Sequence, residues 1–372
     1  MINAFSKIKL YDKYIFNQVF ITTFVAVLLF TVIWIAPEML LNTIQKVLTH
    51  EYTLKTGILV ILYELPNILG KGLPVGLLLG ALFTFDKLSK DSELTIFRTA
   101  GLSFWRISAP VIVLSLMITA FCFVTYDFLI PYTQTKLVSI KKDFFPSQYI
   151  YTQKDKNNKP TLSVIVSRFN YSNIAKIVVL DFSRKSFSDV HGLSNIYVAK
   201  HAQHYPKKWT LNDVTGYRIS NDGIFEHVGF RKNMDILQGV SAQNAYDLMI
   251  FSLKKDREFT NAQLWHYTRL LKQENLDEDY RLMFNKYLQR FLHPFVCVLL
   301  AILGCLLGFS KPREQRLVGF TIAIACIFLY YITLPFFDML AEKGVLSPII
   351  TASFPPIAFL IAICVFYKTK EL

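Results

Sequence analysis

Six apolar stretches constrain the fold of this chain more than any other feature. Five contain no Asp, Glu, Lys or Arg over about 20 residues, which as a helix is long enough to cross a bilayer; they lie at 14–36, 107–126, 291–310, 317–337 and 345–367. A sixth, at 56–85, contains only Glu64 and Lys71 as charged residues. With 53% hydrophobic residues overall, the pattern predicts an α-helical polytopic membrane protein with six transmembrane helices.

The distribution of basic residues predicts the orientation of these helices, because Lys and Arg near a span resist translocation. One set of short loops holds twelve of them: Lys7, Lys9, Lys13, Lys87, Lys90, Arg98, Arg106, Lys311, Arg313, Arg316, Lys368 and Lys370. The opposite loops hold three, Lys46, Lys55 and Lys343. We therefore expect both termini in the cytoplasm, and the polar block between the third and fourth spans outside, in a 3 + 3 arrangement.

This outer block is basic and lacks cysteine. Residues 136–290 contain 24 basic and 15 acidic side chains, the largest share of the +13 formal charge. The excess fits either an acidic ligand or a solvated lysine-rich surface. All five cysteines lie inside predicted spans, so no disulfide framework is expected in the outer block.

Alternating apolar and polar residues predict strands in this block. The segments are 161–169, 175–183, 194–201, 209–219 and 223–230, separated by turn-rich pieces. Pro131 is expected to break the third helix before they begin.

Helical periodicity returns at Thr260. Thr260 with Gln263, and Asn275 with Glu278, have the spacing of capping boxes. The expected domains are a first transmembrane half at 1–135, an outer β-domain at 136–259, a helical connector at 260–290 and a second transmembrane half at 291–372.

Common catalytic and metal-binding motifs are absent from the sequence. There is no HExxH pair, no zinc-type Cys/His cluster and no GxSxG turn. His201 and His204 are three apart in a predicted strand, where that spacing points side chains to opposite faces. "LGKGLP" lacks the first glycine and the Ser/Thr of a phosphate-binding loop. We expect no metal site and no enzymatic activity.

Two features of the spans indicate close packing and a polar cavity. Glycines recur every four residues at Gly72, Gly76 and Gly80, and again at Gly304 and Gly308, a pattern that allows another helix to approach, either within the subunit or between subunits. Glu64 and Lys71 are two helical turns apart and share a face, where a cation could meet a lipid phosphate or the two charges could compensate each other. Together with Trp34 they are the candidate cavity residues.

"DSELTIFRTAG", residues 91–101, predicts a short capped helix on the cytoplasmic side. Asp91 or Ser92 would cap its first turn, Glu93 and Arg98 would complement the helix dipole, and Gly101 would end it. Leu94 and Phe97 would form a face that meets a partner. From the residues alone, the segment is either an ordinary loop helix or a docking site.

Three segments resemble the lipopolysaccharide-export permeases of the LptF/LptG family. "LSKDSELTIFRTAGLSFWRI" is similar to their cytoplasmic coupling segment. "NAQLWHYTRLLKQENLDEDYRLMFNKYLQRFLHPFVCVLLAILGCLLG" is similar to the helix pair that leads into the fourth span, with Arg290 and Pro294 in an Arg-x-x-x-Pro pattern. "KPREQRLVGFTIAIACIFLYYI" resembles the next loop and span. The strands match the family only in type.

The resemblance implies a permease subunit of an ABC transporter in the bacterial inner membrane, with residues 136–259 as an inserted periplasmic β-jellyroll-like domain. A paralogous permease would form a heterodimer with it, an LptB-type ATPase dimer would bind ATP and Mg²⁺ in the cytoplasm, and an LptC-type single-span jellyroll protein would receive lipopolysaccharide. The chain itself would bind no cofactor and no nucleic acid. The implied ATPase-coupling residues are Ser92, Glu93, Leu94, Phe97, Arg98, Ala100 and Gly101.

One departure from the family concerns the first span, whose outer end has no basic residue before Lys46. Lys71 and the basic outer domain would then take over the phosphate contacts. The pattern is shared by both paralogues, so it does not distinguish them, and it specifies neither the structure of the lipid nor the residues of the β-groove. The alternative is a ligand-sensing or structural six-span protein without transport.

Overall fold

The computed structural model describes residues 10–35, 39–141, 149–154, 160–170, 173–182, 184–185, 191–192, 195–205, 208–219, 225–238, 240–309 and 317–370. The chain forms two compact units. Unit 1 contains residues 1–141, 256–264 and 281–372, among them the long apolar helices. Unit 2 contains residues 142–255 and 265–280, among them the strands.

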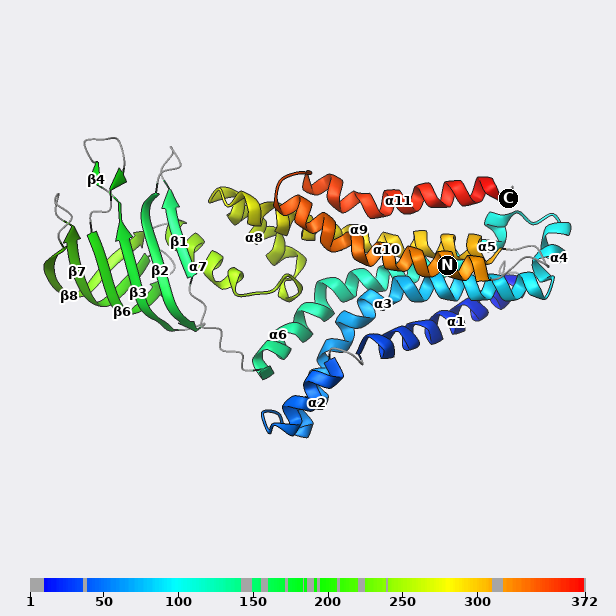
Figure 1. The fold of residues 1–372 in the computed structure, drawn as a ribbon, viewed down its shortest axis with the longest axis horizontal. Helices are drawn as coiled ribbons and strands as arrows, with labels where there is room; N and C mark the ends of the chain where they lie inside the picture. The colour runs from blue at the N-terminus through cyan, green and yellow to red at the C-terminus, as the bar shows by residue number, and fades with distance from the viewer. Residues whose placement is uncertain are drawn as a thin grey trace, which may run out of the picture. The chain divides into compact units, whose positions relative to one another are not determined.

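The helices of unit 1 account for six apolar segments (Figure 1). They are α1 (Leu10–Ile35), α2 (Leu41–Leu48), α3 (Leu54–Lys90), α4 (Glu93–Thr99), α5 (Phe104–Val124), η3 (Thr125–Leu129), α6 (Ile130–Lys141), η4 (Asp256–Glu258), the first residues of α8 (Asn261–Gln273), α9 (Asp277–Gly308), α10 (Leu317–Glu342) and α11 (Pro348–Thr369). Six helical segments of the described chain, with α5, η3 and α6 counted as one, are long and apolar enough to span a membrane. The chain is therefore a multi-pass membrane protein.

The core of unit 1 is built around α3. Its buried residues, Leu77, Leu78, Leu82 and Phe85 among them, pack in one cluster with residues of α1, α4, α5, α9, α10 and α11. α3 is one continuous helix despite Pro66 and Pro74, and its ribbon bends along this stretch (Figure 1). α3 therefore bends without a break in the helix.

The third span does not end at Pro131 as predicted. A π-turn at η3 precedes this proline, and Ile130 donates its N–H to the Thr125 carbonyl across the wider turn. Because proline has no N–H and its ring needs room on the preceding turn, the π-turn admits it, and the helix continues to Lys141.

The helix that leads into the fourth span is continuous with it. α9 runs without a break from Asp277 to Gly308, across the expected boundary between residues 290 and 291. The capping box of Thr260 and Gln263 is confirmed, with both backbone-to-side-chain distances at 3.3 Å. Asn275 is not an N-cap: it has φ +54° and ends α8, where Leu276 donates its N–H to Leu271 O at 3.0 Å.

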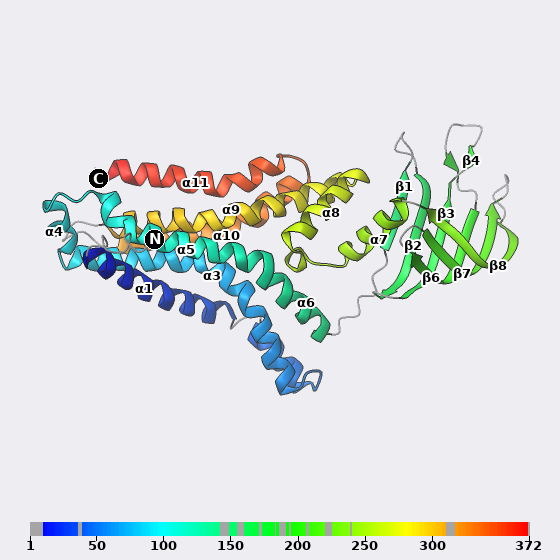
Figure 2. The same cartoon turned by 180° about the vertical axis from the view of Figure 1, so that it is seen from behind.

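Unit 2 is built on an antiparallel six-stranded sheet (Figure 2). Its strands, in the order β1-β2-β3-β6-β7-β8, are Tyr149–Lys154, Pro160–Asn170, Asn173–Asp181, Asn195–Tyr205, Lys208–Ile219 and Phe225–Gln238; β4 (Arg184–Lys185) and β5 (His191–Gly192) form a small separate pair. All five predicted strand regions are present, although parts of their ends lie outside the described residues. β1 and helix α7 (Val240–Ser252) were not predicted, and β8 extends beyond the predicted end.

One face of the sheet is buried and the other is open in the described residues. The buried face includes Val164, Val166, Ile177, Val179, Ala199 and Val214. α7 lies beside the sheet, and the fully buried Trp209 donates its indole N–H to Ala242 O at 2.9 Å. Unit 2 therefore has an apolar core of its own.

Candidate functional site

The segment at 91–101 contains the expected short helix, but not the expected side-chain cap. Asp91 is the residue that ends α3, and Ser92, at φ 60°, makes no side-chain hydrogen bond to α4. Gly101 ends α4 as predicted: it has φ +80°, and Leu102 donates its N–H to Phe97 O at 3.1 Å. This left-handed conformation favours glycine because a Cβ is strained there.

The apolar face of α4 packs into its own subunit. Leu94 is only 2% exposed and belongs to the core cluster, and Phe97 packs against it. Leu94 thus belongs to the core of its own subunit, whereas Phe97 is only partly buried, and a contact of this face with a partner stays a prediction. The exposed face contains Thr95, Ile96, Arg98 and Thr99, with Ile96 62% exposed, and Ala100 and Gly101 after them.

The two charged residues of α4 contact different helices. Glu93 accepts a hydrogen bond from the Tyr14 hydroxyl of α1 at 3.1 Å. The Arg98 guanidinium lies 5.5 Å from the ring centre of Phe309, directly after α9. α4 thus contacts α1 and the residue that follows α9.

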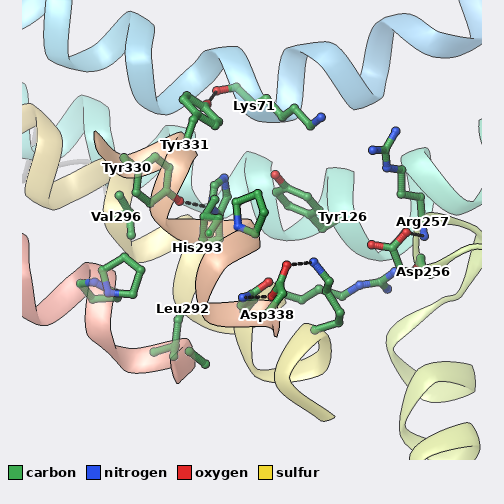
Figure 3. A pocket seen from close by; sticks show the side chains of 18 of the residues that line it. Lys71, Tyr126, Asp256, Arg257, Leu292, His293, Val296, Tyr330, Tyr331 and Asp338 are labelled. Atoms are coloured by element: carbon green, nitrogen blue, oxygen red, sulfur yellow. Dashed lines mark hydrogen bonds and ion pairs between the residues drawn. The ribbon is translucent and has the colours of Figure 1, made fainter. Parts of the chain in front are cut away.

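A cavity of about 450 Å³ lies among α3, η3, α6, η4, α9, α10 and α11 (Figure 3). Four basic and two acidic side chains line it, Lys71, Arg257, Lys286 and Arg290 against Asp256 and Asp338. The remaining lining includes aromatic rings and apolar residues such as Val296, Leu334, Pro335, Pro355 and Pro356. An amphiphilic ligand with a negative group fits this chemistry.

Lys71 and His293 lie in the lining of this cavity (Figure 3). Tyr331 donates its hydroxyl to Lys71 O, so the α3 backbone is bonded to α10 here. His293 Nδ1 is hydrogen bonded to the Tyr330 hydroxyl, and its buried Nε2 has no hydrogen-bond partner in the described residues. One buried polar atom of a cavity-lining residue is therefore unsatisfied among the described residues.

Glu64 lies outside the lining of this cavity. Its carboxylate accepts hydrogen bonds from Asn67 at 2.8 Å and Gln134 at 3.0 Å, and lies 3.8 Å from the Arg257 guanidinium. Only Lys71 of the two charged residues in this span therefore faces the candidate ligand space. The third candidate, Trp34, lies in α1, and its side chain is outside the described part.

Arg290 connects α9 to the loop that precedes α8. Its guanidinium donates to the backbone carbonyls of Asp256 and Phe259 and to Asn261 Oδ1. Asp127 of η3 accepts the Asn261 N–H at 2.8 Å. Periodicity alone could not identify this role, since the contacts are made to backbone atoms; the only sequence signal was the family pattern around Arg290.

The glycine strips pack against helices of the same chain. A Cβ on Gly72 would lie 3.1 Å from Phe30, and one on Gly80 would lie 2.6 Å from Thr23 Cα, both on α1. Gly76 faces Val27 and Thr23 of α1, whereas Gly304 and Gly308 face Leu78 and Leu82 of α3. Of the two interpretations left open, the structure shows packing within the subunit.

The histidines of the sheet do not form a metal site in the described residues, which contain no group of three possible metal ligands. His201 is exposed, whereas His204 stacks on Tyr246 with ring centres 3.8 Å apart. Burial lowers the pKa of His204 below its usual value of 6.5. Stacking on Tyr246 of α7 therefore gives His204 a structural role within unit 2.

The comparison with known families decides the identity. Residues 13–369 match the model of the lipopolysaccharide export system permease LptF/LptG. The chain belongs to the LptF/LptG family. No curated protein matches it. Membership of this family makes the chain a transport permease and not an enzyme, which is consistent with its six apolar helices.

Proposed function

We propose that this LptF/LptG chain is one half of the permease of an ABC transporter that extracts lipopolysaccharide from the inner membrane. The match over residues 13–369 is the observation that carries the proposal. Both termini lie in the cytoplasm, the strands of unit 2 form a periplasmic jellyroll-like domain, and the six spans are arranged 3 + 3 around it. A paralogous permease completes the membrane part.

A separate LptB-type ATPase dimer binds at α4 and supplies the energy. The geometry of α4 supports this role, because its apolar face is fixed in the core while Ile96 and Arg98 face outward. A short helix held in this way moves as one body with the membrane helices, so a force on its exposed face reaches them. ATP and Mg²⁺ bind to the ATPase and not to this chain.

The lined cavity supplies a phosphate contact within this subunit. Its lining combines an excess of basic over acidic side chains with an apolar wall, the combination that a phosphorylated lipid requires. Lys71 is the charged residue of the second span that lines this space. It takes the part of the basic residues missing from the outer end of the first span.

The open face of the unit 2 sheet is the proposed path of the lipid after extraction. Paired positions on all six strands form a row across this face: Ile150, Ile165, Val178, Val198, Thr215 and Phe230. Ile150 and Phe230 are more than 60% exposed, and exposed lysines follow two residues away at Lys176, Lys200 and Lys232. The row offers acyl chains an apolar surface with cations nearby, and an LptC-type jellyroll protein would receive the lipid next.

The proposal predicts that α4 variants uncouple ATP hydrolysis from transport. Glu93→Ala and Arg98→Glu remove side chains outside the core, so the chain should fold and assemble normally. We expect the lipid transferred per ATP hydrolysed to fall roughly tenfold, the factor expected for the loss of one charge-assisted contact. The measurement is transfer from proteoliposomes that contain both permeases and the ATPase.

Lys55→Ala, at an exposed position in the first turn of α3, is the control and should leave this ratio unchanged. Normal transfer per ATP in both charged variants would refute the coupling role of α4.

A further inference from the structure

The first turn of α1 contacts α4 and the start of α5 through three neighbouring side chains. Asp12 pairs with Arg106, Tyr14 bonds to Glu93, and Tyr11 packs on Phe97. α1 has no direct covalent connection to either segment, because α4 follows α3 and precedes α5. The contacts therefore add a connection that the chain order does not provide.

The pair of Asp12 and Arg106 is the most specific of the three contacts. Arg106 donates from both terminal nitrogens to both carboxylate oxygens, at 3.0 and 2.7 Å. Such a fork fixes the orientation of both groups, which a single contact does not. The guanidinium also lies 5.1 Å from the ring centre of Tyr11, so two residues of the same turn hold it.

The other two contacts reach α4 itself. The Tyr14 hydroxyl donates to Glu93 at 3.1 Å, and the Tyr11 and Phe97 rings lie 5.8 Å apart. Glu93 and Phe97 are four residues apart and therefore lie on one side of α4. α1 thus contacts one side of α4 through a hydrogen bond and through a contact between two aromatic rings.

A second attachment joins α1 to the bundle farther along its length. Thr23 and Val27 lie against Gly76 and Gly80 of α3, where the backbones are too close for a Cβ. Thr22 also donates its hydroxyl to Gly80 O at 3.0 Å. These contacts hold the middle of α1 against α3. A displacement of the first turn of α1 would therefore tilt the helix about this contact.

We propose that Tyr11, Asp12 and Tyr14 form a latch that transmits the movement of α4 directly to α1, with Tyr14 and Arg106 as positioning residues. The inference rests on the proposed function, because it assumes that a partner ATPase displaces α4. Tyr14 holds Glu93, and Arg106 fixes the turn that contains Tyr14. Without the latch, α4 would move α1 only through the α3 contacts.

The test uses the full complex of both permeases and the ATPase in proteoliposomes, with two readouts. The first is the lipid transferred per ATP hydrolysed. The second is the distance between spin labels at Phe24 of α1 and Ile361 of α11, both exposed, measured without nucleotide and with the ATPase trapped by ATP and vanadate. Cys326 and Cys364 are replaced, because the structure leaves them accessible.

Charge exchange separates the latch from simple stability. Asp12→Arg and Arg106→Asp should each lower transfer per ATP about fivefold, the factor expected for a lost ion pair of this kind, and should reduce the nucleotide-dependent change in label distance. The double exchange should restore both readouts. Tyr14→Phe, which removes one hydroxyl, should reduce the distance change while Tyr132→Phe, at an exposed tyrosine of α6, should not.

Three results would overturn the latch. These are an unchanged label distance in the wild type on trapping, wild-type readouts in Tyr14→Phe and the single exchanges, and a double exchange as impaired as the single ones although it folds. If the single exchanges do not fold, Tyr14→Phe decides alone. Failure of the proposed function is a different outcome, in which the wild-type complex transfers no lipid.

Discussion

Asp338 illustrates how single polar residues hold the spans together. Asn285 and Gln289 each donate to its carboxylate at 2.8 Å, and Lys286 pairs with it. Thr351 of α11 donates to Asn285 Oδ1 at 2.9 Å. One carboxylate on α10 therefore organises contacts among α9, α10 and α11.

Removing this carboxylate should destabilise the chain strongly. Asp338→Ala leaves two amides without an acceptor and Lys286 without its partner, a change that costs about 3 kcal/mol when an ion pair is largely buried. The control is Asp235→Ala, which removes the exposed pair with Lys208 and should cost less than about 1 kcal/mol. Unfolding of the full chain in detergent measures both, and equal losses would contradict the buried role of Asp338.

At the scale of residues, the sequence predicted charged positions better than their partners. Glu64 and Lys71 stood out because charges inside an apolar run are costly, and both are placed by specific contacts. Asp338 could not be predicted in this way, since it directly follows the apolar run 317–337 and looks like an ordinary end of a span. Its partners are set by the packing of three helices, which no local pattern contains.

At the scale of elements, the close approach of α1 and α3 depends on Gly80. An added Cβ would lie 2.6 Å from Thr23 Cα and 2.7 Å from Thr23 N. Both are backbone atoms, so the contact cannot be relieved by turning a side chain. The two helices must separate to admit a methyl group.

Gly80→Ala should therefore destabilise the chain by about 1–3 kcal/mol through overpacking. Gly70→Ala is the matched control on the same helix, because its Cβ would meet only side chains, at 3.4 Å. We expect it to be neutral or stabilising by up to about 1 kcal/mol, since alanine favours the helix. A thermal unfolding midpoint that is equally lowered in both variants would contradict the account.

Element types were predictable where periodicity is strong, and element ends were not. The six apolar runs and the alternating strands are confirmed. Apolar length marks the membrane-facing part of a helix and not its ends, so the continuation of α6 past Pro131 to Lys141 was missed. β1 was missed because "YIYTQK" is apolar only at its start, and its pairing with β2 decides its structure.

At the scale of the whole molecule, the candidate site consists of α4 and the cavity, and the sequence predicted only part of each. The position of α4 between α3 and α5 follows from the sequence, but its inward apolar face does not, because an amphipathic helix can bury that face in its own core or in a partner. The cavity is lined by side chains from three separate ranges of the chain, within 67–130, 256–257 and 286–356. Only Lys71 among its basic residues was marked in advance as a cavity residue.

The most direct test of the central claim is ATP-dependent transfer of lipopolysaccharide by the assembled complex. Proteoliposomes with this chain, its paralogous permease and the ATPase are loaded with lipopolysaccharide and mixed with a soluble jellyroll acceptor that contains a photo-crosslinking residue. The account predicts crosslinked lipid that accumulates with ATP, and does not accumulate with a non-hydrolysable analogue or without this chain. A complex that assembles and hydrolyses ATP, yet delivers no more lipid to the acceptor than these controls, would contradict it.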